Sequence, residues 1–445
     1  MTSADSSTPY TPLTDAPTSA ARRVAIACGV GTAIERYDFF IYGTAAATVF
    51  APQFFPQVSD VAGRLAAFAA FAIGFVALPL GGIVMGHFGD RRGRKAMLVW
   101  SLMLMGLSTF AIGLLPTYAS IGIAAPLLLV ALRFVQGFAL GGEWGGAALM
   151  AVEHAPGAHR GLFGSFVALG IPAGLILANV VFLIASVSVS PGAFAAWGWR
   201  IPFLASAVLV LVGLYVRVGV AESPVFASLR HQRAERDAPV RDLVRDHWRK
   251  VMLAAGSHMS SAALGYVAVV YFVSYATREL GLPLPTMLAL LVVSSVAFAV
   301  SIVTCAHWSD RWGRRRMMVA GLSALGLWSV VFFPLADTRS VPLVGVALAV
   351  MMILQGPYMG AQPAVFSELF PATVRYSGAS LSQTLGNIMG GALTPIVATA
   401  LFDITKSSWS ITAYLATLSL ISWLCCLRLQ ETYRQPIAHD AQPHA

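Results

Sequence analysis

The chain alternates between long apolar runs and short polar connections over most of its length. A helix that crosses a bilayer needs about 20 mostly apolar residues, and these runs approach or exceed that length. The pattern therefore predicts twelve transmembrane helices, at residues 24–49, 61–86, 97–115, 120–151, 160–187, 198–219, 251–277, 285–307, 317–335, 341–366, 372–402 and 409–428.

Polar stretches divide these runs into two groups of six. Residues 22–219 and 249–430 each hold one group, and the basic segment 220–248 links them. We expect disordered polar tails at residues 1–21, which are rich in Ser, Thr and Pro, and at residues 431–445. The first run is too long for the apolar core of a signal peptide, so we interpret it as the first span. The expected fold is an all-α polytopic membrane protein built from two six-helix bundles.

Composition supports this interpretation. Hydrophobic residues make up 57% of the chain, charged residues make up 11%, and the mean hydropathy is +0.73. Soluble domains carry about 25% charged residues, so an ordinary soluble enzyme and a disordered protein are both excluded. The four cysteines all lie in apolar runs without a Cys-x-x-Cys pair, and we expect neither a disulfide framework nor a metal site. No catalytic motif of a membrane protease, lipase or ATPase is present, so we expect no enzyme and no cofactor.

The positive charge predicts the orientation in the membrane. The net charge of +9 would suggest a nucleic-acid partner in a soluble protein, but here the basic residues lie mainly in short connections between apolar runs. If the N-terminus is inside, most of the 29 Lys and Arg residues fall on the inner side. This is the positive-inside pattern, so we expect both termini and the middle segment to be cytoplasmic, with lipid rather than nucleic acid as the partner.

Matching segments recur in the same order in the two groups of spans. They are residues 87–95 with 307–315, Gln136-Gly137 with Gln355-Gly356, and the set Glu153, Pro156, Arg160 with the set Glu368, Pro371, Arg375. An even number of spans separates the copies, so both run in the same direction. Parallel repeats related by an axis along the membrane normal are one known plan of secondary transporters.

Several segments also resemble a known family. Gly86 through Lys95 resembles the signature Gly-x-x-x-Asp-Arg-x-Gly-Arg-Arg/Lys of the major facilitator superfamily. Residues 35–43, 133–146 and 197–203 resemble, more narrowly, the metabolite:proton symporter family, and residues 54–90 look most like its shikimate permease type. The resemblance covers all twelve expected spans. It implies the major facilitator fold, with two pseudo-symmetric bundles, and a monomeric carrier driven by the proton gradient in a bacterial inner or plasma membrane.

Charged residues inside the first span are candidates for function, because charges are costly in the bilayer. Glu35 and Asp38 are three residues apart and share a helix face. Neighbouring carboxylates repel in a low dielectric, so we expect one of them to bind the coupled proton or to contact substrate. Alternatively, Arg36 or Arg133 neutralises an acid and only fixes helix packing. The family usually has an aromatic residue where this chain has Arg36.

The fourth expected span holds two further charges, Arg133 and Glu143. The resemblance implies that Arg133 responds to the proton and to the substrate charge in the cavity, and a guanidinium suits a carboxylate because it binds both oxygens at once. The alternative is a fixed ion pair with an acid of the first span. Glu143 lies among glycines that permit close helix approach, and it is either a second proton site or a hydrogen-bonding group between helices.

The two repeated basic connections are candidates for an inner gate. In each copy an aspartate can accept hydrogen bonds from a helix N-terminus or an arginine of the other half, and glycines such as Gly89 and Gly93 allow a tight turn. The alternative is a plain topology anchor. The predicted gate residues are Gly86, Gly89, Asp90, Arg91, Gly93, Arg94, Asp310, Arg311, Gly313 and Arg314. We also expect gate ion pairs between Glu153 and Arg160 and between Glu368 and Arg375.

Polar and aromatic residues of the spans could line a central cavity, or could equally well serve as contacts between helices. The main candidates are Tyr42, His258, Tyr266, Gln355, Tyr358, Gln383 and Asn387, with Tyr271, Tyr275 and Gln362 as further ones.

Taken together, the residues and the resemblance predict a proton symporter that imports a small organic acid of the shikimate, aromatic acid or dicarboxylate type. Two transport alternatives stay open, namely uniport and proton symport of zwitterionic osmolytes such as proline or glycine betaine. The polar tail after the last span is short, so we expect no long coiled coil of the kind some osmolyte carriers have. A non-transporting membrane receptor is the alternative from another class, and the lack of a sizeable soluble segment argues against it.

Overall fold

The computed structural model describes residues 18–92, 94–141, 143–153, 155, 159–218, 243, 245–371 and 374–433. The side chains of residues 18–20, 86–98 and 216–218 are outside this description. Over the described residues the secondary structure is helical throughout.

Long helices account for most of the chain in each half. The first half contains α1 (Thr18–Thr48), α2 (Phe50–Phe54), α3 (Asp60–Arg92), α4 (Arg94–Leu114), α5 (Tyr118–Ile121), α6 (Ala124–Leu140), α7 (Glu143–Glu153), α8 (Arg160–Ser188), α9 (Pro191–Ala196), the 3-10 turn η3 (Gly198–Arg200) and α10 (Ile201–Val218). The second half contains α13 (Trp248–Tyr266), the π-helical turn η5 (Val267–Tyr271), α14 (Phe272–Arg278), α15 (Leu284–Trp312), α16 (Arg314–Ala336), α17 (Val341–Glu368), α18 (Arg375–Gly386), the π-helical turn η6 (Asn387–Ala392), α19 (Thr394–Thr405) and α20 (Ser408–Arg428).

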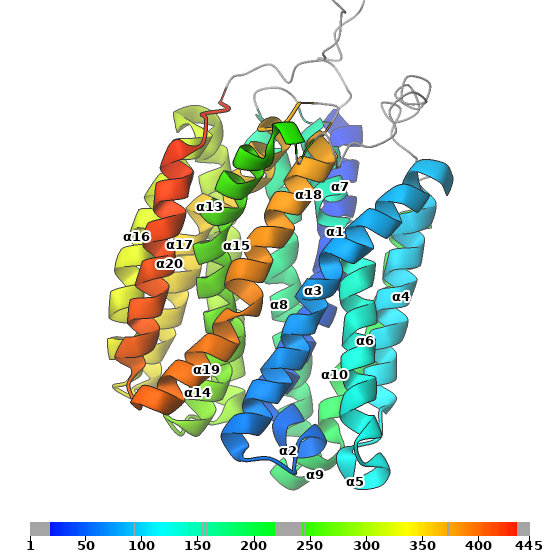
Figure 1. The fold of residues 1–445 in the computed structure, drawn as a ribbon, viewed down its shortest axis with the longest axis vertical. Helices are drawn as coiled ribbons and strands as arrows, with labels where there is room; N and C mark the ends of the chain where they lie inside the picture. Colours follow the sequence, from blue (N-terminus) through cyan, green and yellow to red (C-terminus); the bar gives the residue numbers. More distant parts are fainter. Residues whose placement is uncertain are drawn as a thin grey trace, which may run out of the picture.

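The long helices form two six-helix bundles that stand side by side (Figure 1). Ten helical segments of the described chain are long and apolar enough to cross a membrane. The 31-residue α1, which carries three charged residues near its middle, and the 21-residue α4 complete the expected twelve. The molecule is therefore an all-α polytopic membrane protein. We call the end where α1 begins and α20 ends the upper end, as drawn in Figure 1, and the opposite end the lower end.

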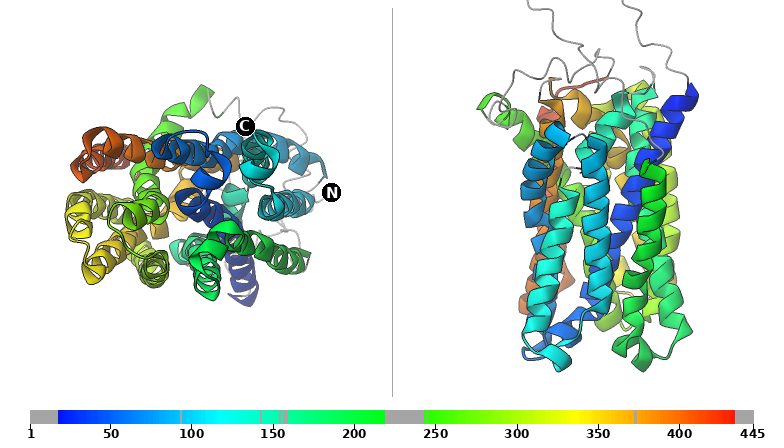
Figure 2. Two further views of the ribbon diagram at one scale, coloured as in Figure 1. Left: turned by 90° about the horizontal axis from the view of Figure 1, so that it is seen from below. Right: turned by 90° about the vertical axis from the view of Figure 1, so that its right-hand side faces the viewer.

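The two bundles meet along corresponding helices. In the first bundle α8 packs along α15 and α17, and in the second bundle α18, η6 and α19 pack against α3. The view along the bundle axis in Figure 2 displays the helices as two groups on either side of a shared interface. A site between the bundles is thus lined mainly by helices that come from both halves of the sequence.

Two expected spans are interrupted near the bundle interface. The seventh and eleventh spans contain the π-helical turns η5 and η6. Such π-turns are frequent at functional sites because they leave backbone groups and side chains in irregular directions. The pattern of apolar residues does not reveal these π-helical turns, since both spans are continuous apolar runs in the sequence.

The two repeated basic connections differ from the expectation in one respect. Helix α3 continues through Gly89 to Arg92, so Gly89 lies in a helix rather than in a tight turn. In the second copy the turn is at Gly313, whose φ of 103° is a conformation that favours glycine. Gly93 and the side chains of Asp90, Arg91 and Arg94 lie outside the described residues, and Gly86 is described only by its place in α3.

A candidate transport site between the two bundles

A small central cavity of about 30 Å³ lies between the two bundles. The first bundle lines it with residues of α1, α3, α6 and α7, and the second lines it with residues of α18 and η6. The lining residues are Arg36, Phe39, Phe75, Leu78, Leu140, Gly141, Trp144, Gly145, Ser380, Gln383, Thr384 and Asn387. The first bundle thus contributes one cation and a largely apolar wall, and the second contributes hydroxyl and amide groups.

An ion-pair network joins the two bundles at the upper end. Glu368 at the end of α17 pairs with Arg160 of α8 at 3.8 Å and with Arg314 of α16. Glu153 of α7 pairs with Arg375 of α18 at 3.7 Å. The expected pairs were Glu153 with Arg160 and Glu368 with Arg375, each within one half of the sequence. The pairs Glu368–Arg160 and Glu153–Arg375 link the two halves instead of lying within one. The reason is the pseudo-symmetric packing, which places the end of α7 beside the start of α18 and the end of α17 beside the start of α8.

Asp310 adds a second kind of link at the upper end. Its carboxylate oxygens accept hydrogen bonds from the backbone N–H groups of Gly161 and Leu162, at 2.8 and 3.0 Å, and Arg314 lies 3.4 Å away. These N–H groups belong to the first turn of α8, which has no partners for them within the helix. A carboxylate is favourable there because the helix dipole is positive at its N-terminus. Asp310 of the second bundle thus caps the N-terminus of α8 in the first bundle. The next predicted gate residue, Arg311, is exposed.

The lower end has ion pairs between the bundles as well. Asp60 at the start of α3 lies 2.7 Å from Arg278 at the end of α14, and Arg64 lies 3.5 Å from Glu279. Sequence analysis did not single out these four residues, because they lie in connections at the ends of spans, where charges are common. Both ends of the central cavity are therefore bridged in this structure.

Asp310→Asn is expected to loosen the upper end selectively. The asparagine keeps one carbonyl acceptor but loses the charge, so the amides of Gly161 and Leu162 should exchange hydrogen roughly tenfold faster, since a charged hydrogen bond is worth about 1.5–3 kcal/mol. Hydrogen exchange read by mass spectrometry measures this. Arg278→Gln is the matched control, because it should affect the start of α3 and leave the α8 amides as they are. Unchanged exchange at the α8 amides in Asp310→Asn contradicts the capping role.

The two acidic residues of α1 and Arg133 of α6 are all buried. Glu35 and Asp38 are both buried, and one oxygen of Asp38, Oδ1, has no hydrogen-bond partner among the described residues. The guanidinium of Arg133 donates to the Phe71 carbonyl at 3.4 Å and to Gln136 at 3.3 Å. Gln136 in turn donates to the Thr109 hydroxyl at 2.7 Å, and Thr109 is a hydrogen-bonding neighbour of Asp38. Arg133 and Asp38 are thus linked through two polar side chains.

Aromatic rings enclose Arg133. Its guanidinium carbon lies 4.1 Å from the ring centre of Phe39, 4.4 Å from Tyr42 and 4.8 Å from Phe71. Cation–π contacts of this kind stabilise a desolvated cation by about 2 kcal/mol or more. Only 1% of Arg133 is exposed, and among the described residues it is not one of those that line the central cavity.

The candidate cavity residues of the second half fall into two groups. Gln383 and Asn387 line the cavity, and behind them His258 contacts Asn387 at 3.3 Å and Gln362 at 3.1 Å, while Gln362 donates to Gln383. Gln355 and Tyr358 instead bond to Ser261 and Ser257 of α13, at 2.6 and 3.1 Å. The first group forms a polar wall, and the second holds helices of one bundle together.

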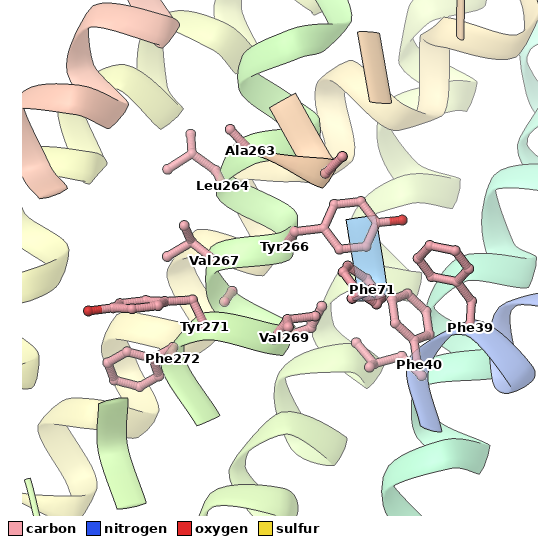
Figure 3. Packing of buried hydrophobic residues seen from close by; sticks show 14 of the residues in the cluster. Phe39, Phe40, Phe71, Ala263, Leu264, Tyr266, Val267, Val269, Tyr271 and Phe272 are labelled. Carbon is pink, nitrogen blue, oxygen red and sulfur yellow. The ribbon is translucent and has the colours of Figure 1, made fainter. Parts of the chain in front are cut away.

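Two tyrosines expected in the cavity wall are packed among aromatic rings. Tyr266 extends from α13 across the bundle interface toward Phe39 and Phe71, as Figure 3 shows, with ring centres 5.9 and 5.8 Å apart. Tyr42 lies over Arg133 and against Phe50. Tyr266 is therefore a contact between the bundles beside the cavity. Glu143, at the start of α7, accepts a hydrogen bond from the Ser101 hydroxyl of α4 at 3.3 Å and does not belong to the described cavity wall.

Comparison with known proteins agrees with this architecture. Residues 28–395 and, in a second match, 253–443 match the family described as the Major Facilitator Superfamily. The chain is 42% identical to the inner membrane metabolite transport protein YhjE of Escherichia coli over 98% of this chain and 99% of that protein. It is 38% identical to the shikimate transporter of Escherichia coli over 94% and 96%, and 29% identical to the proline/betaine transporter of that organism over 94% and 85%.

Solved structures show the same fold. A partially occluded, inward-open structure of the xylose transporter XylE from Escherichia coli superposes with a TM-score of 0.73 at 17% identity, over 93% of this chain and 99% of that one. The proton:xylose symporter XylE bound to a glucose derivative gives a TM-score of 0.71 at 18% identity, over 94% and 97%. With its twelve spans in two bundles and a cavity between them, the chain is a multi-pass transporter of small molecules that belongs to the major facilitator superfamily and, within it, to the metabolite:proton symporter family.

Proposed function

We propose that this protein is a proton-coupled symporter that imports a small organic acid by alternating access. The observation that carries the proposal is the position of the buried acids Glu35 and Asp38 on the helix that lines a central cavity, with ion pairs between the bundles at both ends. Uncompensated charges inside a membrane protein are costly, so a proton that neutralises an acid can change which conformation is favoured.

The upper end corresponds to the cytoplasmic side in this proposal, in a bacterial inner membrane. The connections at that end hold most of the basic residues, which is the arrangement favoured for cytoplasmic loops. The name of the Escherichia coli relative as an inner membrane protein supports the location. Substrate would then enter past Asp60 and Arg278 and leave past Glu368, Arg160 and Asp310.

The two sets of ion pairs serve as alternating gates. The pairs at the upper end can exist only while that end is closed, and the pairs at the lower end only while the lower end is closed. Each set therefore stabilises one closed end, and the balance between them sets which side of the membrane the cavity faces. Ion pairs at exposed positions contribute little, so we assign the larger effect to the pair between Glu368, which is almost fully buried, and Arg160 of the other bundle.

Proton coupling is assigned to Asp38 and Glu35, with Arg133 as the responding cation. Arg133 is held by rings and by Gln136 rather than by a direct ion pair with Asp38. An ionised Asp38 would attract the guanidinium of Arg133 and favour its movement away from the aromatic rings. A protonated Asp38 would leave the guanidinium among the rings. The proton would thus change the packing of α1 against α6.

The proposal is tested by substrate-induced proton movement in proteoliposomes that contain the purified protein. A pH dye follows the addition of shikimate, aromatic monocarboxylates, dicarboxylates, proline or glycine betaine. External alkalinisation with an organic acid is the expected result. A signal only with proline or betaine would favour osmolyte symport, and solute uptake without any proton signal would replace symport by uniport. Liposomes without protein provide the control for passive diffusion of the protonated acids.

A further inference from the structure

His258 of α13 is a buried titratable residue that neither the proposed gates nor the proposed proton coupling uses. Only 1% of its surface is exposed. Its imidazole lies nearly parallel to the ring of Tyr358, with ring centres 5.8 Å apart, and Phe366 meets it edge-on at 6.4 Å. These two rings of α17 limit how the imidazole can turn, so each of its nitrogens keeps its own partner.

Each ring nitrogen of His258 faces a side-chain amide. Nε2 of Gln362 lies 3.1 Å from Nδ1 of the imidazole, and Oδ1 of Asn387 lies 3.3 Å from its Nε2. An amide nitrogen can only donate a hydrogen bond, and an amide oxygen can only accept one. Nδ1 of His258 is therefore the acceptor, and Nε2 carries the proton that is donated to Asn387. The partners thus define a neutral imidazole with its proton on Nε2.

The hydrogen bonds continue from His258 to the cavity wall. Nε2 of Gln362 also donates to Oε1 of Gln383. Gln383 of α18 and Asn387 of η6 both line the central cavity. Their amide oxygens are occupied by Gln362 and His258, which lie behind the wall. Because the oxygen and nitrogen of an amide point in different directions, the amide N–H groups of both residues are left to face the cavity.

The position of one proton decides the direction of this chain. With the proton on Nδ1 of His258, Gln362 would have to accept from the imidazole and from Gln383, and Asn387 would have to donate to Nε2. Gln383 and Asn387 would then present carbonyl oxygens to the cavity. The amides would have to turn together, because a buried polar group left without a partner is costly. The same wall can therefore offer either donors or acceptors.

We propose that His258 is a positioning residue of the transport site, and that its Nε2 proton turns Gln383 and Asn387 so that the wall donates hydrogen bonds to the substrate. The inference rests on the proposed function, because it treats the central cavity as the place where substrate binds. The cavity of about 30 Å³ holds no more than a few water molecules while both ends are bridged. Substrate would meet the wall when one end opens, with acceptor atoms toward Gln383 and Asn387.

Solid-state NMR of the full-length protein in lipid bilayers tests the direction of the chain without any substrate. Histidine labelled with an NMR-active nitrogen isotope reports which ring nitrogen carries the proton, and the signal of His258 is identified by its loss in His258→Asn. In the wild type, Nε2 should carry the proton and Nδ1 should be bare. A proton on Nδ1, or on both nitrogens, would mean that the chain runs otherwise and would overturn the inference.

Transport kinetics test the positioning role. Asparagine at position 258 places an amide oxygen near the site of Nδ1 and can still accept from Gln362. Glutamine reaches the site of Nε2 and can still donate to Asn387, whereas leucine can do neither. With shikimate as the probe in proteoliposomes, His258→Asn and His258→Gln should each raise KM roughly three- to tenfold, and His258→Leu roughly 10- to 100-fold. The value of kcat should fall by less than about twofold.

Gln355→Leu is the matched control, because Gln355 lies about two turns before Gln362 on the same helix. It bonds to Ser261 of α13 instead of His258, so its replacement also breaks a polar contact between α13 and α17. A loss of packing should lower the amount of active protein and leave KM within about twofold of the wild type. A rise in KM as large as that of His258→Leu, or an unchanged KM in His258→Leu, would contradict the positioning role. If the expected KM values are found but uptake moves no protons, symport is wrong and the role of His258 is supported.

Discussion

Replacing Asp38 by Asn together with Glu35 by Gln should abolish proton-driven accumulation of substrate, while exchange of substrate across the membrane continues. In proteoliposomes a pH gradient of about one unit can drive roughly tenfold accumulation for each proton carried, because 1.4 kcal/mol corresponds to a factor of ten. The double variant should instead reach equal concentrations on both sides. Counterflow, in which labelled substrate enters in exchange for unlabelled substrate inside, should persist.

The physical reason is the burial of both acids next to the route between the bundles. Neither side chain has access to water that could stabilise its charge, since each is almost completely buried. A proton must therefore accompany any movement that leaves the acid without a partner. The amides have nearly the same shape as the acids, so the packing of α1 against α8 and α3 is retained while the exchangeable proton is lost.

Asp403→Asn is the matched control for this experiment. Asp403 is a partly exposed carboxylate near the lower end of α19 that pairs with Lys406 at 2.6 Å. Its replacement removes a negative charge without touching the acids of α1, so accumulation should equal that of the wild type. Full accumulation by the Asp38→Asn, Glu35→Gln double variant would assign proton coupling to another group, with Glu143 as the next candidate.

The architecture could be predicted because the bilayer imposes it. Every span must bury its backbone polar groups in a helix of about 20 apolar residues, and that requirement leaves a visible pattern in the sequence. The pattern does not show where a helix continues beyond the apolar run, as α3 does through Gly89 to Arg92. It also does not show the π-helical turns η5 and η6, because the residues in and around them stay largely apolar.

The site could be predicted only in part, because hydropathy does not determine how a helix is rotated about its axis. Arg36, between Glu35 and Asp38, looked like a local counter-charge, yet it is the residue that lines the cavity, and Arg133 is enclosed among rings. Likewise, Glu153 and Arg160 are close in sequence, but the ion pairs found for them lead to Arg375 and Glu368 of the other bundle. The position of Arg36 in the cavity wall and the partners of Glu153 and Arg160 both depend on how the two bundles pack against each other.

Gly81→Ala is expected to destabilise the first bundle strongly, although it adds a single methyl group. A Cβ at position 81 would overlap the carbonyl oxygen of Phe138, and one at Gly137 or Gly141 would overlap the carbonyl oxygen of Gly74 or Leu78. Helices α3 and α6 thus touch backbone to backbone, as small residues allow in membranes. A side-chain rotation cannot relieve such an overlap, so the helices must separate, at a cost of about 3 kcal/mol or more.

The separation should also affect the cluster around Arg133, which α6 carries and which bonds to the Phe71 carbonyl of α3. Thermal unfolding of the purified variant, followed by tryptophan fluorescence and by binding of a thiol dye to the buried cysteines, should therefore begin at a clearly lower temperature. Gly192→Ala in the short helix α9 is the control, because a Cβ there meets open space, and it should melt as the wild type does. Equal melting temperatures for Gly81→Ala and the wild type would mean that α3 and α6 can move apart freely, and that their glycines do not hold Arg133 in place.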